Sequence, residues 1–295
     1  MKEKPGLKIR TAGACLLLCL VLFVVPPGVW AAPKPDGGVA VLVLHEVARE
    51  TRGSPFVLPP AEFARLLDEL RLLGCTFIDL DTFHAYLAGK KSVPPRAVLL
   101  TFDDGYAGVY AHAHPVLAEH GAPAVMFPVV KWFTIPPPED AWPHLSTAQA
   151  REMLASGLWA FGSHTFDGHT RVAGTDGRTR AALTHPVRLA DGSAETPGAY
   201  RLRVWRDIQQ ANTWFARQLG FVPEDFAAPH GELSGELHAL LRLAGYKYVY
   251  VQGKRLNYPG ASLIYRLSVT DVDRALRDLA DLLGLTVSRP STASR

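Results

Sequence analysis

The sequence predicts an α/β fold, a single distorted (β/α) barrel with about seven parallel strands. Short apolar runs alternate with amphipathic helical patterns along the chain, as a parallel sheet requires. The 295 residues suit one barrel of about 250 residues once the terminal segments are set aside. Neither a GxGxxG nor a P-loop motif supports an open doubly wound sheet. With 48% apolar and 20% charged residues, the composition excludes disorder, collagen and coiled coil.

The N-terminal segment resembles an export signal rather than a part of the barrel. Four basic residues lie within the first ten, an apolar run follows over 12–25, and small residues precede a cleavage point near Ala31. We therefore expect a signal peptide over 1–31, with an uncleaved anchor as the alternative, and a chain that is secreted or associated with the cell surface, outside the cytoplasm. Without this segment the formal charge falls from +3 to zero, so we expect no nucleic-acid partner.

Each element of the barrel has its own sequence signal. After a Pro/Gly-rich linker over 32–38, strands are predicted where apolar runs lie between turn residues, at 39–44, 76–80, 97–102, 122–130, 158–161, 226–228, 246–251 and 263–267. Helices are predicted where apolar residues recur three and four apart, at 59–74, 106–120, from Ser146 onward, 200–219, 234–244 and 271–283. The segments 131–144 and 170–199 break the alternation, and we expect long loops there, at the mouth of the barrel.

Six polar side chains and one proline stand at or shortly after the ends of four of the predicted strands. They are, in chain order, His45, Asp103, Asp104, His164, His169, Pro229 and His230. Because the C-terminal ends of barrel strands share one rim, we expect these residues to lie together. One carboxylate and two imidazoles can hold a divalent metal and leave room for water, and a second carboxylate is then free as a base. The alternatives are an ordinary Asp-Gly turn at 103–105 and histidines that merely hydrogen-bond to a neighbouring carboxylate.

Two of these stretches resemble a known family. The run VLLTFDDGY at 98–106 is similar to the first motif of the polysaccharide deacetylases with NodB homology, carbohydrate esterase family four. The run GSHTFDGH at 162–169 resembles their second motif. The histidine spacing, the LHEV at 44–47 and the insertion at 170–199 most resemble the IcaB and PgaB deacetylases of poly-β-1,6-N-acetylglucosamine. The resemblance implies a polysaccharide deacetylase domain of the NodB type over 39–290.

The resemblance also implies a metal site and a base. Asp104, His164 and His169 match the metal ligands of the family, and Asp103 matches its general base. The implied cofactor is one divalent metal ion, zinc in the first place, with cobalt or nickel as alternatives. In the implied reaction, Asp103 removes a proton from the water that attacks the N-acetyl carbonyl.

Other roles are less directly matched. His45 is our first candidate for the general acid, because it ends the first strand and an imidazole titrates near neutral pH, and His230 is the second. We expect substrate contacts from Tyr106, Pro229 and His230, with backbone N–H groups near His230 helping to hold the oxyanion. The family's arginine that orients the base is replaced by Ala227, and its late LxxH acid is missing.

The expected function is extracellular, metal-dependent de-N-acetylation of poly-β-1,6-N-acetyl-D-glucosamine, a biofilm exopolysaccharide, with release of acetate. The alternatives are deacetylation of peptidoglycan, chitin or another acetylated glycan, and a polysaccharide-binding protein without turnover. The expected partner is an N-acetylglucosamine polysaccharide. We expect a monomer, and association with a membrane surface or cell wall stays open.

Overall fold

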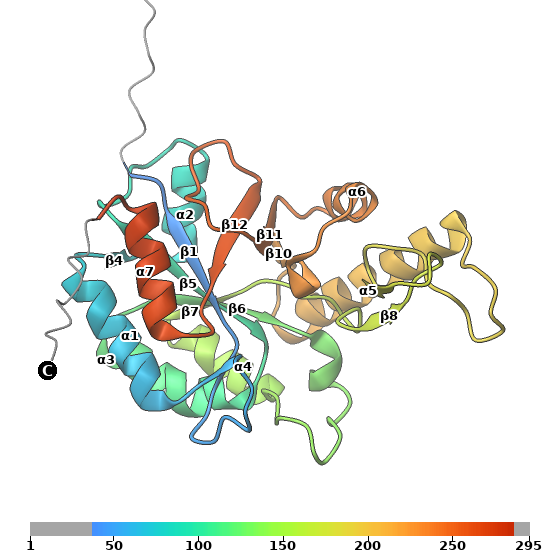
Figure 1. The fold of residues 1–295 in the computed structure, drawn as a ribbon, viewed down its shortest axis with the longest axis horizontal. Helices are drawn as coiled ribbons and strands as arrows, with labels where there is room; N and C mark the ends of the chain where they lie inside the picture. Colours follow the sequence, from blue (N-terminus) through green and yellow to red (C-terminus); the bar gives the residue numbers. More distant parts are fainter. Residues whose placement is uncertain (1–36, 286–295) are drawn as a thin grey trace, which may run out of the picture. The chain divides into compact units, whose positions relative to one another are not determined.

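The computed structural model describes residues 37–285, so the predicted signal peptide lies outside the described residues. Within them, parallel strands form a nearly closed barrel in the order β10-β11-β12-β1-β5-β6-β7, with the short β4 also beside β5 (Figure 1). The strands are β1 (Ala40–Leu44), β4 (Thr76–Phe77), β5 (Ala97–Asp104), β6 (Ala124–Pro128), β7 (Trp159–Phe161), β10 (Asp225–Ala227), β11 (Tyr248–Gln252) and β12 (Leu263–Ser268). This arrangement confirms the predicted barrel.

The two outermost strands of this order meet at a single residue. The backbone N–H of Ser163, just after β7, donates to the carbonyl of Asp225 at 2.9 Å. The N–H of Ala227 donates to the carbonyl of Ser163, also at 2.9 Å. These two bonds close the ring at the rim where β7 leads into the segment 162–169.

Seven helices of the described chain surround or close this sheet. They are α1 (Pro60–Leu72), α2 (Leu80–Leu87), α3 (His114–Glu119), α4 (Thr147–Ala155), α5 (Pro197–Gln218), α6 (Gly235–Leu243) and α7 (Val272–Leu282). Figure 1 shows α1, α3 and α7 along one side of the sheet, while α5 extends away on the other. Among the described residues, no helix is both long enough and apolar enough to cross a membrane.

The alternation of side chains along each strand divides the core in two. On β1, Leu42 and Leu44 face outward and pack with residues of α1, α3, α4 and α7. Val41 faces inward with Leu99 and Phe127, and Phe83 from α2 packs into the same interior cluster. Because both faces of the strands are covered, the strands are largely apolar, which is the pattern that predicted them.

Several elements differ from the sequence prediction. The strand predicted over 76–80 ends at Phe77, and α2 follows at once because Asp79 caps it by accepting the N–H of Thr82 at 2.7 Å. The helix predicted over 106–120 begins as a π-helical turn (Val109–Ala113) before α3. The predicted loop 170–199 contains an antiparallel hairpin, β8 (Arg171–Ala173) and β9 (Thr179–Ala181). A further short parallel pair, β2 (Glu46–Val47) and β3 (Val57–Leu58), lies beyond β1.

Candidate metal and catalytic site

The two adjacent aspartates end the central strand β5. Asp103 pairs with Phe127 and Asp104 with Pro128 of β6, so both belong to the sheet and not to a simple turn. Along β5, Leu99 and Asp103 share the inward face. Asp104 has a backbone φ of +71°, a conformation that non-glycine residues rarely adopt. The strand therefore presents two carboxylates in different directions at the rim of the barrel.

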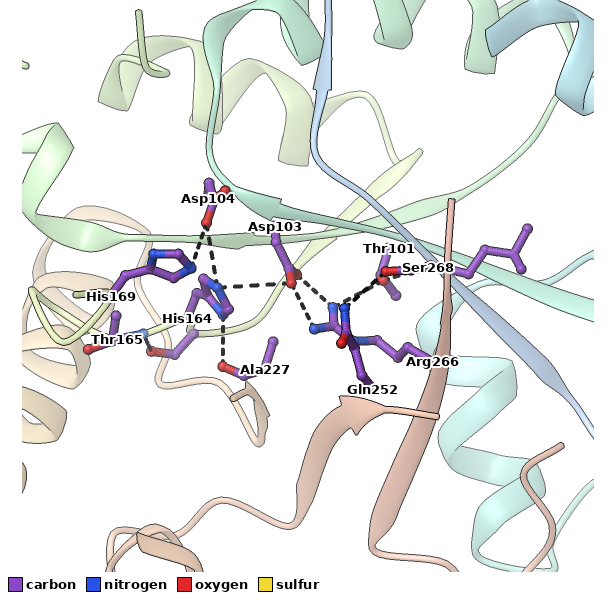
Figure 2. A network of polar contacts seen from close by, with 12 residues as sticks. Thr101, Asp103, Asp104, His164, Thr165, His169, Ala227, Gln252, Arg266 and Ser268 are labelled. Carbon is purple, nitrogen blue, oxygen red and sulfur yellow. Dashed lines mark hydrogen bonds and ion pairs between the residues drawn. The ribbon is translucent and has the colours of Figure 1, made fainter. Parts of the chain in front are cut away.

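The segment after β7 brings both predicted histidines to Asp104. The Nδ1–H of His164 donates to the carbonyl of Ala227 at 2.8 Å, an assignment that leaves Nε2 as the free lone pair. The Nε2 atoms of His164 and His169 lie 3.5 and 3.4 Å from Oδ1 of Asp104 (Figure 2). One donor atom from each of the three residues lies within 4.8 Å of the other two.

The chemistry of these three groups fits a divalent metal ion. Oδ1 of Asp104 is buried and has no hydrogen-bond partner among the described residues, although a buried carboxylate oxygen normally has one. Burial lowers the pKa of His164 to about 4, so this imidazole is neutral at pH 7 and its Nε2 can act as a ligand. One carboxylate and two neutral imidazoles suit zinc and its first-row neighbours.

Asp103 forms a buried, bidentate ion pair that the sequence analysis did not predict. Its two oxygens accept from Nη1 and Nη2 of Arg266 at 2.6 and 2.7 Å (Figure 2). The side chains are 4% and 1% exposed, so water screens the pair little. Burial by itself raises the pKa of Asp103, but the charge and hydrogen bonds of Arg266 counteract it and hold the pKa at about 2. Asp103 is therefore ionised and fixed in orientation.

Arg266 comes from β12, not from the position of Ala227 on β10. The sequence contained a signal for it, because an arginine interrupts the apolar strand LIYRLS. Arginine is almost never fully buried unless it is paired. The side chain also donates to the hydroxyl of Thr101 at 3.3 Å, which anchors it beneath Asp103.

A pocket of about 500 Å³ opens over the two aspartates and the two histidines. His45 lines it, with its ring centroid 4.8 Å from that of Phe56, and His230 lies against His169 at 4.4 Å. Tyr106 also lines the pocket. The other lining side chains include Glu46, Trp142, Arg171 and Gln252. Aromatic faces beside charged and amide groups suit a sugar ring and its hydroxyl groups.

The turn after β10 directs His230 into the pocket and leaves Pro229 outside its lining. His230 has a φ of +59°, which directs its ring toward the pocket, and burial lowers its pKa to about 4. Pro229 is buried and is not among the residues that line the pocket. It begins the short 3-10 turn (Pro229–Gly231) that presents His230 and Gly231.

Comparison with known proteins agrees with this geometry. The model of the family described as polysaccharide deacetylase matches residues 90–249. The chain belongs to the polysaccharide deacetylase family. This membership confirms the family that the sequence motifs predicted and places the chain among deacetylases, which are hydrolases.

Two curated relatives of this chain carry the same name, poly-beta-1,6-N-acetyl-D-glucosamine N-deacetylase. The one from Escherichia coli K12 is 26% identical over 226 residues, which cover 72% of this chain and 34% of that protein. The one from Staphylococcus aureus MRSA252 is 23% identical over 216 residues, covering 72% of this chain and 67% of that protein. The chain thus spans about a third of the length of its E. coli relatives.

Solved structures show the same fold. IcaB from Ammonifex degensii is 29% identical with a TM-score of 0.70, and the match covers 84% of this chain and 97% of that one. The BpsB deacetylase domain from Bordetella bronchiseptica is 26% identical with a TM-score of 0.69, covering 80% and 98%. A de-N-acetylase from Aggregatibacter actinomycetemcomitans has a TM-score of 0.75 at 24% identity, covering 82% and 99%, and supports the fold alone.

Proposed function

We propose that this deacetylase removes N-acetyl groups from poly-β-1,6-N-acetyl-D-glucosamine in a metal-dependent reaction outside the cytoplasm. The observation that carries the proposal is a fixed, ionised carboxylate, Asp103, beside a cluster of three potential metal ligands. The names of the E. coli and S. aureus relatives support this polymer over other acetylated glycans.

Asp104, His164 and His169 would hold the metal ion, zinc in the first place. A divalent metal in such a site polarises an amide carbonyl and lowers the pKa of a water molecule. His164 is oriented for this role, because its Nδ1–H is bonded to the carbonyl of Ala227 and its Nε2 points toward Asp104.

Asp103 would accept the proton of the attacking water. Its two hydrogen bonds to Arg266 prevent the carboxylate from rotating, and the same ion pair keeps it ionised before water attacks. A preorganised base of this kind loses little free energy to reorientation during the reaction. Arg266 thus acts on the reaction through Asp103.

His45 would protonate the nitrogen of the sugar as the C–N bond breaks and acetate leaves. It lines the same pocket as Asp103, and its buried Nδ1 has no hydrogen-bond partner among the described residues. Tyr106 and His230 would contact the substrate, and Pro229 would act through the turn that carries His230, whose backbone we assign to the oxyanion. His230 is the second candidate from the sequence, but burial lowers its pKa to about 4, so it is neutral at pH 7 and suits substrate contact better than proton donation.

Release of free amine from β-1,6-linked N-acetylglucosamine oligomers by the full chain tests the proposal, with chitin oligomers in parallel. We expect release that a chelator abolishes and that zinc or cobalt restores. Faster turnover of chitin would contradict the β-1,6 assignment. Metal binding without release from either oligomer would indicate another acyl substrate, and tight glycan binding without metal would indicate a binding protein.

A further inference from the structure

We propose that Asp207, on helix α5, positions the loop that carries His164 and His169, and that it thereby sets the affinity of the site for its metal ion. The inference rests on the proposed function, because it takes these two histidines as ligands. Asp207 touches neither of them, so it is a positioning residue and not a catalytic one.

The carboxylate of Asp207 binds three groups of this loop. It is 9% exposed and accepts the hydroxyl of Thr165, the N–H of Phe166 at 3.1 Å and the N–H of Asp167 at 2.7 Å. The hydroxyl oxygen of Thr165 in turn accepts the N–H of Gly168 at 2.8 Å. One carboxylate thus fixes, directly or through one hydroxyl, all four residues between the two histidines.

The loop needs such a partner because its backbone is strained. Thr165 has a φ of +111°, a region that L residues rarely adopt and that a β-branched side chain makes worse. A backbone of this kind persists when surrounding contacts determine it. Without the carboxylate, the N–H groups of Phe166 and Asp167 would lose their acceptor, and relaxation of the loop would separate His164 from His169.

The opposite edge of the loop is held by the turn after β6. The N–H of Val130 donates to the carbonyl of Thr165 at 3.1 Å, and the N–H of Lys131 donates to the carbonyl of Phe166 at 2.9 Å. These bonds involve carbonyl groups, whereas Asp207 binds N–H groups. Loss of Asp207 would therefore free one edge of the loop and leave the other attached, which favours a change in histidine geometry over unfolding.

The first test is Asp207→Asn in the full chain. The amide of Asn keeps the shape of the carboxylate but replaces one acceptor oxygen with an NH₂ donor. That donor must then face an N–H group of the loop. We expect affinity for Zn²⁺ and Co²⁺, measured by competition with a chelating dye, to fall about 10- to 100-fold. We also expect the visible absorption of bound Co²⁺ to change, because the geometry of its ligands changes.

Glu195→Gln is the matched control. Glu195 is also a buried carboxylate, 7% exposed, that accepts a backbone N–H, from Val187 at 3.1 Å, and pairs with Arg203 of α5 at 2.8 Å. It holds the 170–199 insertion and not the loop that carries His164 and His169. We expect wild-type metal affinity and an unchanged Co²⁺ spectrum from this variant.

A pair of substitutions at Thr165 tests the same contact if Asp207→Asn does not fold. Thr165→Ser keeps the hydroxyl and should retain metal affinity close to that of the wild type. Thr165→Val keeps the shape without the hydroxyl and should lose affinity as Asp207→Asn does. Combined with Asp207→Asn, it should add less than its separate effect, because both changes remove one shared hydrogen bond.

The outcomes separate this inference from the proposed function. Suppose that the wild-type chain binds metal and releases amine. If Asp207→Asn then shows wild-type metal affinity and an unchanged Co²⁺ spectrum, the inference is overturned and the proposed function stands. Thr165→Val takes the place of Asp207→Asn in this comparison if Asp207→Asn does not fold. An equal loss of affinity in Glu195→Gln overturns the inference as well, because the effect would not be specific to the loop. A wild-type chain that binds no metal refutes the proposed function and this inference together.

Discussion

The ion pair between Arg266 and Asp103 makes the stability of the barrel depend on one arginine. The substitution Arg266→Met removes the guanidinium group and keeps a side chain of similar length. Lowering the pKa of a carboxyl group from 3.8 to about 2 corresponds to about 2 kcal/mol in favour of its ionised form, after the cost of burial has been met. The substitution removes that gain and leaves a buried carboxylate unpaired. We therefore expect the free energy of unfolding at pH 7 to fall by about 3–5 kcal/mol.

The pH dependence of this loss has a definite sign. The pKa of Asp103 is lower in the folded chain than its ordinary value, so the pair contributes fully above pH 3.8, and its contribution is lost as the pH falls toward about 2. In Arg266→Met, burial without the arginine raises the pKa of Asp103, so protonation relieves the variant as the pH falls. The difference in unfolding free energy between wild type and Arg266→Met should therefore be large at neutral pH and shrink progressively as the pH falls toward 2. Urea unfolding of chelator-treated protein, followed by tryptophan fluorescence, measures it.

Arg65→Met is the control for this experiment. Arg65 also forms ion pairs, here with two separate carboxylates, Glu62 at 2.7 Å and Asp273 at 2.8 Å, but these pairs lie at the surface, where water and salt screen the charges. We expect little change in its stability at any pH. A loss in Arg266→Met no larger than the loss in Arg65→Met, or one that is the same at pH 7 and pH 3, would refute the reasoning.

Three further substitutions test the site and its support. Asp103→Asn should keep metal affinity and lower kcat for amine release by about 100- to 10,000-fold, and an active variant would exclude Asp103 as the base. His45→Ala should lower kcat more than it changes KM, whereas wild-type kcat would exclude His45 and transfer the acid role to His230 or water. Gly162→Ala would place a Cβ against the ring of Phe127 and near the carbonyl of Asp225, so urea unfolding should show a loss of about 1–3 kcal/mol; unchanged stability would mean that the ring moves aside.

The barrel could be predicted from the sequence because local patterns determine most of its elements. Most of the long strands are largely apolar on both faces, and Ser146 with Gln149 forms the capping box that starts α4, as the sequence indicates. Helix α2 could not be separated from the strand before it, because Leu80–Leu87 is short and follows Phe77 after two residues. Apolar residues in so short a segment fit a strand and a helix equally well.

The cluster of Asp104, His164 and His169 could be predicted for a similar reason. Asp104 ends one apolar strand and the two histidines lie in the segment after another, positions that a parallel barrel brings to one rim, and the family resemblance selected these three as the ligands. Arg266 and Asp207 lie in the middle of a strand and a helix, where neighbouring residues do not reveal a role. Arg266 and its partner Asp103 are 163 residues apart in the sequence, and Asp207 and its partner Asp167 are 40 residues apart. Such pairs exist only after the chain has folded.

Both missed residues nevertheless share a feature that sequence periodicity contains. Arg266 is two residues after Ile264, so it lies on the inward face of β12, and Ile264 packs in the barrel interior. Asp207 is three residues after Val204 and lies on the buried stripe of α5. A charge in phase with an apolar stripe must be buried, and a buried charge requires a partner of opposite charge or several hydrogen-bond donors. Arg266 is paired with the opposite charge of Asp103, and Asp207 accepts several hydrogen bonds from the loop that carries His164 and His169. Charged residues at core positions therefore indicate which residues support a site, even where no sequence motif includes them.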